Sequence, residues 1–311
     1  MLSQMTSFFN SAFYFAGTNW KSIMAAITLG LVFGAFWLVF YLPPLLKKPM
    51  LWVVAAVSAI LTWTAVSFMQ IPLQYWYGQG INHFLSQTVI LRWYLIAAFP
   101  LVLISGLVQE AAKLVPTLVC WWRSKRSLTP KMGLIIGAVS GAGFGVFEAI
   151  WVHNQIFVNG VSWSVVDNYA LGLWERVFAV AFHIAASALT GWGIAKRKGW
   201  LFYIIAACLH GFVNYSIILI DDGKMTSIQS EIYLTVIAVL TTAVVLWLRW
   251  RKEKEIPADN PPVVSIDAAS GNPPSGATGT TSEIVPPVTP APVPDLPPVV
   301  PPDVTPQPPV G

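Results

Sequence analysis

Two glutamates and two histidines lie deep inside apolar segments of the chain. Glu110 lies in AAFPLVLISGLVQEAAKLVPTLV, Glu148 in GAVSGAGFGVFEAIWV, and His183 and His210 in two later apolar segments. A carboxylate at such depth in a membrane is costly unless it faces a polar cavity or a partner. Glutamate with histidine, without a serine or cysteine beside a base, favours activation of water over covalent catalysis. These four residues are therefore the candidate site.

Two of the four residues have a polar neighbour one helical turn away. Lys113 follows Glu110 at i+3 and can pair with it, while Asn214 follows His210 at i+4 and shares its face. Histidine and asparagine side chains can supply the donors that stabilise an oxyanion when water adds to a carbonyl group. For Glu110 and Lys113 taken alone, a structural ion pair is the alternative interpretation.

The same residue types can also bind a metal ion. Glu148, His183 and His210 would then hold zinc, and Glu110 would be the base. The residues do not lie in an HExxH helix. Zinc is therefore an alternative to catalysis without a cofactor.

The segments that carry these residues are typical of membrane-spanning helices. Of the 311 residues, 55% are hydrophobic and only 10% are charged, against about 25% charged in a soluble domain. We expect an all-α polytopic membrane protein with an interfacial segment at 1–22. The alternative interpretation of 6–20 is an eighth, short span. We expect no nucleic-acid partner. Seven apolar runs reach the length of about 20 residues that a bilayer requires. They are approximately 23–46, 50–72, 93–122, 132–154, 173–195, 200–220 and 230–250.

Lysine and arginine residues orient the predicted spans. Thirteen of the 18 follow the first, third, fifth and seventh spans, and four lie on the opposite side. Because the side richer in these residues faces the cytoplasm, we expect an outside N-terminus and a cytoplasmic C-terminus. At a rise of about 1.5 Å per residue, the two glutamates and two histidines lie about 18 to 26 Å from this basic side. The four side chains therefore share one layer, from the midplane toward the outer leaflet.

Small residues recur through the fourth predicted span. Gly133, Gly137, Gly141 and Gly145 are spaced by four residues, and Glu148 follows the last of them by three. Such a ladder lets a membrane helix pack with close backbone contact. We therefore expect it to bury Glu148 in protein rather than in lipid.

Residues 256–311 differ in composition from the rest of the chain. They hold 17 of the 24 prolines and five acidic residues but no basic residue. Such a segment cannot form a core, and we expect disorder with polyproline II character. A solubilising or spacer tail is the favoured interpretation, and a docking site for a cytosolic Pro-recognising partner is the alternative. Residues 23–255 then form the transmembrane domain, with a catalytic core at about 93–220.

Four short motifs in these spans resemble those of the PrsW-type intramembrane proteases. QEAAK at 109–113 is similar to their EExxK motif, and FGVFE at 144–148 is similar to their FxxxE motif. FH at 182–183 and HGFVN at 210–214 resemble the remaining histidine motifs. The HxxxN form is also similar to the fourth motif of the related CAAX-prenyl endopeptidases, and ERVFAVAFHIAASAL resembles the YhfC-type membrane peptidases.

The resemblance implies a glutamic-type intramembrane protease of a bacterial plasma membrane. Its substrate would be a membrane-spanning or membrane-anchored protein. Glu110 would be the main general base, and Glu148 would assist it or share a proton. His183 and His210 would position water or stabilise the oxyanion, and Asn214 would support the oxyanion.

One residue departs from the family pattern, and two other classes of protein stay open. Gln109 stands where the resembled family has the first glutamate of its paired motif. If that first carboxylate is the essential one, the protein is either inactive or uses Glu148 instead. Intramembrane ionisable residues also mark proton-coupled transporters, although no internal repeat links the first three spans to the next three. A catalytically silent scaffold or sensor with a docking tail is the third class.

Overall fold

A computed structural model describes residues 20–157 and 169–251. Seven helices in these ranges are long and apolar enough to cross a membrane, which confirms the predicted all-α polytopic fold. Residues 1–19 of the expected interfacial segment and the whole Pro-rich tail lie outside the described residues. The helical elements are α2 (Trp20–Leu38), η1 (Val39–Tyr41), α3 (Met50–Ala65), η2 (Val66–Gln70), α4 (Ile71–Phe84), α5 (Gln87–Arg92), α6 (Tyr94–Arg123), α7 (Pro130–Ile156), α9 (Ala170–Ala195), α10 (Gly199–Asp221) and α11 (Ser227–Trp250).

Local sequence signals set where several of these helices begin. The Thr129 hydroxyl accepts a hydrogen bond from the Met132 amide, and a proline follows in the first turn of α7. Thr226 and Gln229 form a reciprocal capping box at the start of α11. These caps satisfy backbone donors that the first helical turn leaves without a partner.

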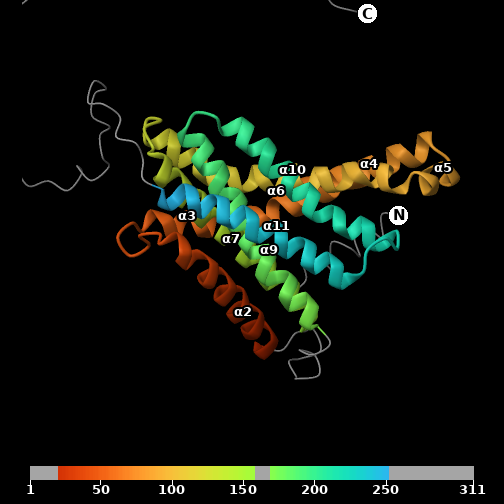
Figure 1. Cartoon of the computed structure of the whole chain (residues 1–311), viewed down its shortest axis with the longest axis horizontal. Helices are drawn as coiled ribbons and strands as arrows, with labels where there is room; N and C mark the ends of the chain where they lie inside the picture. The colour runs from red at the N-terminus through yellow and green to blue at the C-terminus, as the bar shows by residue number, and fades with distance from the viewer. Residues whose placement is uncertain (1–19, 158–168, 252–311) are drawn as a thin grey trace, which may run out of the picture. The chain divides into compact units, whose positions relative to one another are not determined.

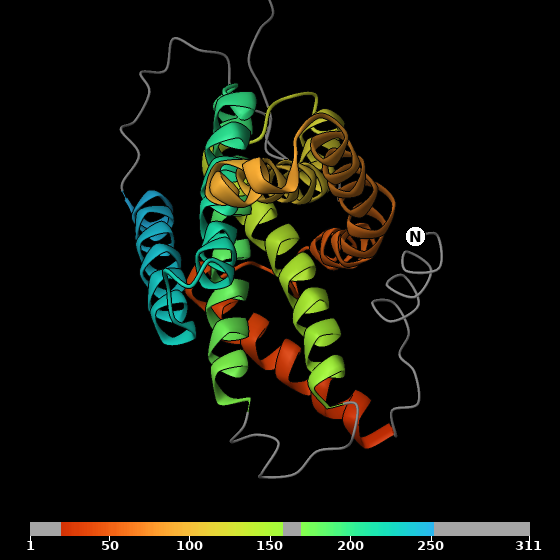
Figure 2. The same ribbon diagram turned by 90° about the vertical axis from the view of Figure 1, so that its right-hand side faces the viewer.

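Helices α7 and α9 form the centre of the bundle. They are the most buried of the spanning helices and pack against each other along their length. Helices α2 and α3 cover α7, whereas α10 and α11 cover α9, and α6 packs against α10 and α3. Figures 1 and 2 show this arrangement, with the yellow-green α7 and the green α9 running side by side. Side chains on facing surfaces of α6, α7, α9 and α10 are therefore enclosed by protein.

The glycine ladder of α7 lies directly against the backbone of α9. A Cβ atom added at Gly133, Gly137 or Gly141 would overlap the carbonyl oxygens of Gly191, Ser187 and His183, respectively. The contacts therefore repeat every four residues on both helices. This register fixes the height of His183 relative to α7 and supports the ladder's predicted role in packing.

A short π-helical turn interrupts the second spanning segment. Helices α3 and α4 join through η2 into one helical run over Met50–Phe84, longer than the predicted 50–72. The π-turn ends at Gln70, whose side chain reaches α6. Single π-turns inside longer helices frequently occur at functional sites, because they rotate the side chains that follow.

Serine residues connect α7 to its neighbours near the centre of the bundle. The Ser140 hydroxyl donates to the carbonyl oxygen of Lys113 on α6 at 2.7 Å, and it lies 3.1 Å from the Ser58 hydroxyl on α3. These bonds join α3, α6 and α7 at the level of Lys113. The backbone that carries Lys113 is thus tied to the central helix.

We predict that Gly141→Ala destabilises the bundle and disturbs the placement of His183. The added methyl group must displace the α9 backbone, and overpacking of this kind typically costs about 1–3 kcal/mol. Gly78→Ala is the matched control, because a Cβ atom there meets nothing within 4 Å. Thermal unfolding in detergent should show a lower Tm for Gly141→Ala and an equal or higher Tm for Gly78→Ala. Equal Tm values for the Gly141 variant and wild type would contradict the assigned helix contact.

Candidate functional site

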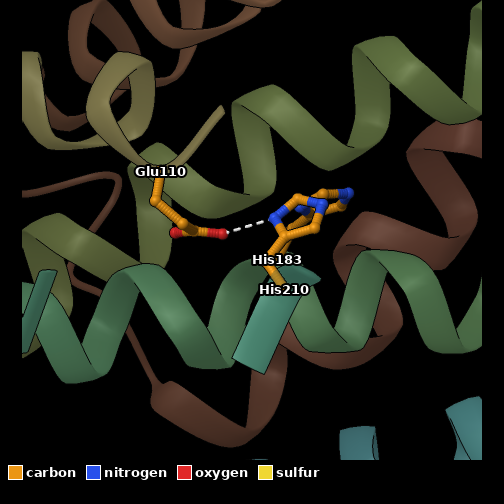
Figure 3. A group of neighbouring side chains, drawn as sticks. All are labelled: Glu110, His183 and His210. Atoms are coloured by element: carbon orange, nitrogen blue, oxygen red, sulfur yellow. Dashed lines mark hydrogen bonds and ion pairs between the residues drawn. The ribbon is translucent and has the colours of Figure 1, made fainter. Parts of the chain in front are cut away.

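Four helices bring the predicted site residues into one cluster. Glu110 comes from α6, Glu148 from α7, His183 from α9 and His210 from α10. The imidazole centroids of His183 and His210 are 5.2 Å apart. Figure 3 shows the Glu110 carboxylate pointing toward the two rings. Residues separated by up to 100 positions in sequence therefore meet inside the bundle.

Glu110 is almost fully enclosed and interacts with two partners. Its Oε1 atom forms an ion pair with Lys113 and lies 2.7 Å from Nδ1 of His210. The side chains of Glu110 and Lys113 are each only 1% exposed. The pair expected from the i+3 spacing is thus present, and removing either partner would leave a buried charge at a cost of about 3–5 kcal/mol.

The Lys113 ammonium connects the two halves of the cluster. Besides Glu110, it contacts Nδ1 of His183 at 2.9 Å and lies 5.0 Å from the centroid of the Phe144 ring. The face of an aromatic ring attracts a cation, and the attraction is larger where water is excluded. Lys113 therefore occupies the space between Glu110 and His183.

Glu148 is held from two sides through one carboxylate oxygen. Its Oε2 atom lies 2.8 Å from Nε2 of His183 and accepts a hydrogen bond from Nη1 of Arg176 at 3.2 Å. Arg176 also forms an ion pair with Glu175, the residue before it on α9. In the described part of the chain, no hydrogen bond engages the second oxygen of Glu148.

These contacts assign the proton positions on both imidazole rings. An ionised carboxylate only accepts hydrogen bonds, so Nε2 of His183 donates to Glu148 and Nδ1 of His210 donates to Glu110. The other nitrogen of a neutral ring carries a lone pair. Nδ1 of His183 uses its lone pair to accept from Lys113. Each histidine is thus oriented by a carboxylate.

A small polar cavity adjoins the cluster. Its volume is about 70 Å³, enough for one or two water molecules. Glu148 lines it, whereas Glu110 does not, and the Glu148 side chain is 16% exposed. Residues that line the cavity also include Gln109, Glu175, Arg176, His183, His210 and Asn214. The two glutamates therefore differ in their access to water.

Gln109 and Asn214 meet through Ser105 on α6. The Gln109 amide donates to Oε1 of Gln70 at 3.0 Å and to the Ser105 hydroxyl at 3.2 Å. The Asn214 amide donates to the same hydroxyl at 3.0 Å. Gln109 is buried at the cavity, and its Oε1 atom has no hydrogen-bond partner. The amide at this position thus fits a local network that includes the π-turn residue Gln70.

Sequence reasoning missed two parts of this cluster. Arg176 served in the prediction only as one of the four basic residues on the outer side, and Glu175 had no predicted role, but both lie in the first turns of α9 and line the cavity. Arg176 precedes His183 by seven residues, which is two helical turns, and this spacing was the signal that could have placed both on one face. Gln70 had no comparable signal, because its direction depends on the π-turn.

Comparison with known proteins gives the family. Residues 48–248 match the family described as PrsW family intramembrane metalloprotease, and this range includes α3 and nearly all of α11. The chain belongs to the PrsW family. The match extends on both sides of the core at about 93–220 that carries the four motifs. No curated protein and no solved structure matches the chain. The activity of this family is intramembrane proteolysis of membrane-embedded protein.

The family description includes a metal ion, and the residues of the cluster fit one in type and number. One ligand atom each from Glu110, His183 and His210 lies within 4.8 Å of the others. Two histidines and one glutamate form a common set for catalytic zinc. The sequence placed Glu148 in this set, whereas the group that lies together in the structure contains Glu110. The Lys113 ammonium lies against two of the three residues, so a metal ion would compete with it.

We predict that Lys113→Met makes the protein dependent on a metal ion for stability. The substitution removes the ammonium and leaves the Glu110 carboxylate buried without a cation, so the metal-free variant should unfold at lower temperature. Zinc should then restore the Tm, because the competing cation is gone. Metal content and Tm of purified protein, with and without zinc, are the measurements. Lys224→Met, at an exposed ion pair, is the matched control. A variant that binds no zinc would contradict a metal site at these three residues.

Proposed function

We propose that the protein hydrolyses a peptide bond of a membrane-embedded protein, with Glu148 as the general base. One observation carries this assignment: of the two glutamates in the cluster, Glu148 is the one that lines the cavity. Glu110 is enclosed between Lys113 and His210. The family resemblance of the sequence favoured Glu110 as the main base and Glu148 as the assisting residue. The access of Glu148 to water supports the reverse assignment.

The contacts of Glu148 suit a base that abstracts a proton from water. Arg176 and His183 hold its Oε2 atom, which fixes the plane of the carboxylate. The second oxygen is then free to accept a proton from a water molecule in the cavity. The orientation of the carboxylate matters for catalysis as well as its basicity, because proton transfer requires an approach of about 2.6–3.2 Å between heavy atoms.

The remaining residues support the steps that follow. The water oxygen bonds to the carbonyl carbon, and the proton taken up by Glu148 passes to the amine nitrogen as the carbon–nitrogen bond breaks. One N–H of the Asn214 amide donates to Ser105, and its second N–H can donate to the developing oxyanion. The Arg176 guanidinium at the cavity adds positive charge near the same atoms.

Glu110 has a positioning role in this scheme. Its carboxylate orients the His210 ring and holds the Lys113 ammonium against His183. With a metal ion bound, Glu110, His183 and His210 would hold it, and the ion would polarise the carbonyl group or the water. Either arrangement leaves Glu148 at the cavity as the base.

The wall of the cavity supports a protein substrate that is itself in the membrane. Ala179, Phe182, Val213 and Leu234 add apolar surface from α9, α10 and α11 to the polar groups. An extended peptide with small apolar side chains suits such a wall. Family membership favours this activity over a proton-coupled transporter or a silent scaffold. A single-span protein is therefore the substrate class we propose, with cleavage within the bilayer.

We predict that Glu148→Gln abolishes most hydrolysis while the fold survives. Loss of a general base lowers kcat by about 10²–10⁴-fold. Glu110→Gln, unlike Glu148→Gln, should also lower the Tm, because it leaves Lys113 and His210 without their shared partner. Cleavage of a single-span reporter by the purified protein, with Tm recorded for each variant, tests both expectations.

Asp222→Asn is the control for this experiment, because it makes the same carboxylate-to-amide change in an ion pair at the end of α10. It should cleave at the wild-type rate. Glu148→Gln that cleaves as fast as wild type would refute Glu148 as the base. Activity lost in Glu110→Gln but kept in Glu148→Gln would return the role of base to Glu110.

We predict that Arg176 acts by positioning Glu148. Arg176→Gln should lower kcat more than it raises KM, because the carboxylate loses one of its two orienting contacts. Arg176→Lys should restore part of kcat, since one cation can still reach Oε2. Arg92→Gln, on the exposed α5, controls for loss of charge. Equal kcat for Arg176→Gln and wild type would contradict the positioning role.

A further inference from the structure

Three basic residues adopt a backbone conformation that normally favours glycine. Lys125, Arg126 and Arg197 have φ angles of 52°, 65° and 58°. In the described part of the chain, Leu42 is the remaining non-glycine residue with positive φ. Side chains with a Cβ atom are disfavoured in this left-handed region. Local strain of this kind persists where the surrounding structure requires it, and it clusters at ligand sites.

The strain arises because two helices end in the same way. At the end of α6, the amides of Lys125 and Arg126 donate to the carbonyl oxygens of Trp122 and Trp121. At the end of α9, the amides of Arg197 and Lys198 donate to Ile194 and Gly193. Both patterns are Schellman motifs, whose left-handed position is usually glycine. Basic residues replace glycine at both ends.

The two strained loops border one cavity. A cavity of about 360 Å³ is lined by Arg126 from the α6–α7 loop and Arg197 from the α9–α10 loop, together with Trp121 and Trp200. The loops lie at the end of the bundle where α6 and α9 stop and α10 begins, at the left of Figure 1 in yellow and green. Two guanidinium groups from separate loops thus share one site.

The cavity has positive charge but no acid. The six acidic residues in the described ranges are distributed elsewhere, and none lines this cavity. No described carboxylate pairs with Arg126 or Arg197. The Arg126 guanidinium lies 5.4 Å from the centroid of the Trp121 ring. Planar guanidinium forks suit the oxygens of a phosphate group.

The other wall of the cavity is apolar. Leu118 of α6 and Ile194 of α9 line it, as does Trp200, which is 73% exposed. A soluble anion makes no contact with apolar side chains. A phospholipid joins its phosphate to glycerol and acyl chains, which can pack against them. Basic pockets at the cytoplasmic ends of membrane helices bind anionic headgroups for the same reason. We propose that this cavity binds the phosphate headgroup of an anionic phospholipid, separately from the site at Glu148.

The test uses glycine variants of the full chain, purified in detergent. Arg126→Gly and Arg197→Gly remove the charge and also relieve the left-handed strain. Phosphatidylglycerol, phosphatidylcholine with the same acyl chains, and inorganic phosphate are the three probes. Bound lipid is measured by native mass spectrometry and stabilisation by Tm. Wild type should retain phosphatidylglycerol and gain Tm from it, but gain nothing from the other two probes.

The variants should separate stability from lipid binding. Without lipid, the double variant should unfold at the same or a higher temperature than wild type. Its affinity for phosphatidylglycerol should fall about 30-fold, and that of each single variant about fivefold. Lys47→Gln combined with Lys48→Gln removes two charges from the same end of the bundle and should retain the lipid.

Three outcomes would overturn the proposal. The double glycine variant could retain phosphatidylglycerol as wild type does. The lysine control could lose the lipid equally, which would make the effect one of diffuse surface charge. Inorganic phosphate could stabilise wild type as well as phosphatidylglycerol does, which would assign the cavity to a free anion.

Discussion

A charge between membrane-spanning helices must find its partner inside the protein, because lipid offers none. In this bundle, Glu110 is paired with Lys113 and Glu148 with Arg176, and His183 links the two pairs. The two negative charges of the glutamates balance the two positive charges of Lys113 and Arg176. The site is thus one connected network, and the placement of each side chain depends on the others.

This network depends on how closely the central helices approach each other. Carbonyl oxygens of α9 occupy the space that side chains at Gly133, Gly137 and Gly141 would fill. Because Glu148 and His183 lie on the two helices joined in this way, their 2.8 Å contact is set by backbone packing. Helix backbones in direct contact move less than side chains do, which suits a site that must hold its geometry.

Much of the site followed from sequence, because a membrane makes polar residues conspicuous. The common depth of the glutamates and histidines predicted their meeting, and helical spacing predicted the pairing of Glu110 with Lys113. Depth alone could not tell which glutamate faces a cavity, since that depends on the rotation of α6 and α7. It likewise left open which glutamate joins the histidines as a possible metal ligand. The direction of Gln70 was beyond pattern reasoning, because a π-turn changes the helical period.

The two charge pairs differ in where their partners come from. Glu110 and Lys113 lie one turn apart on α6, so that helix carries its own counter-charge when it enters the bilayer during synthesis. Glu148 and Arg176 lie on α7 and α9. Arg176 also has Glu175 beside it on α9, whereas the Glu148 charge remains uncompensated until the two helices meet. Insertion of α6 can therefore precede tertiary assembly. Insertion of α7 on its own leaves Glu148 unpaired and is costly, which favours its entry into the membrane together with α9.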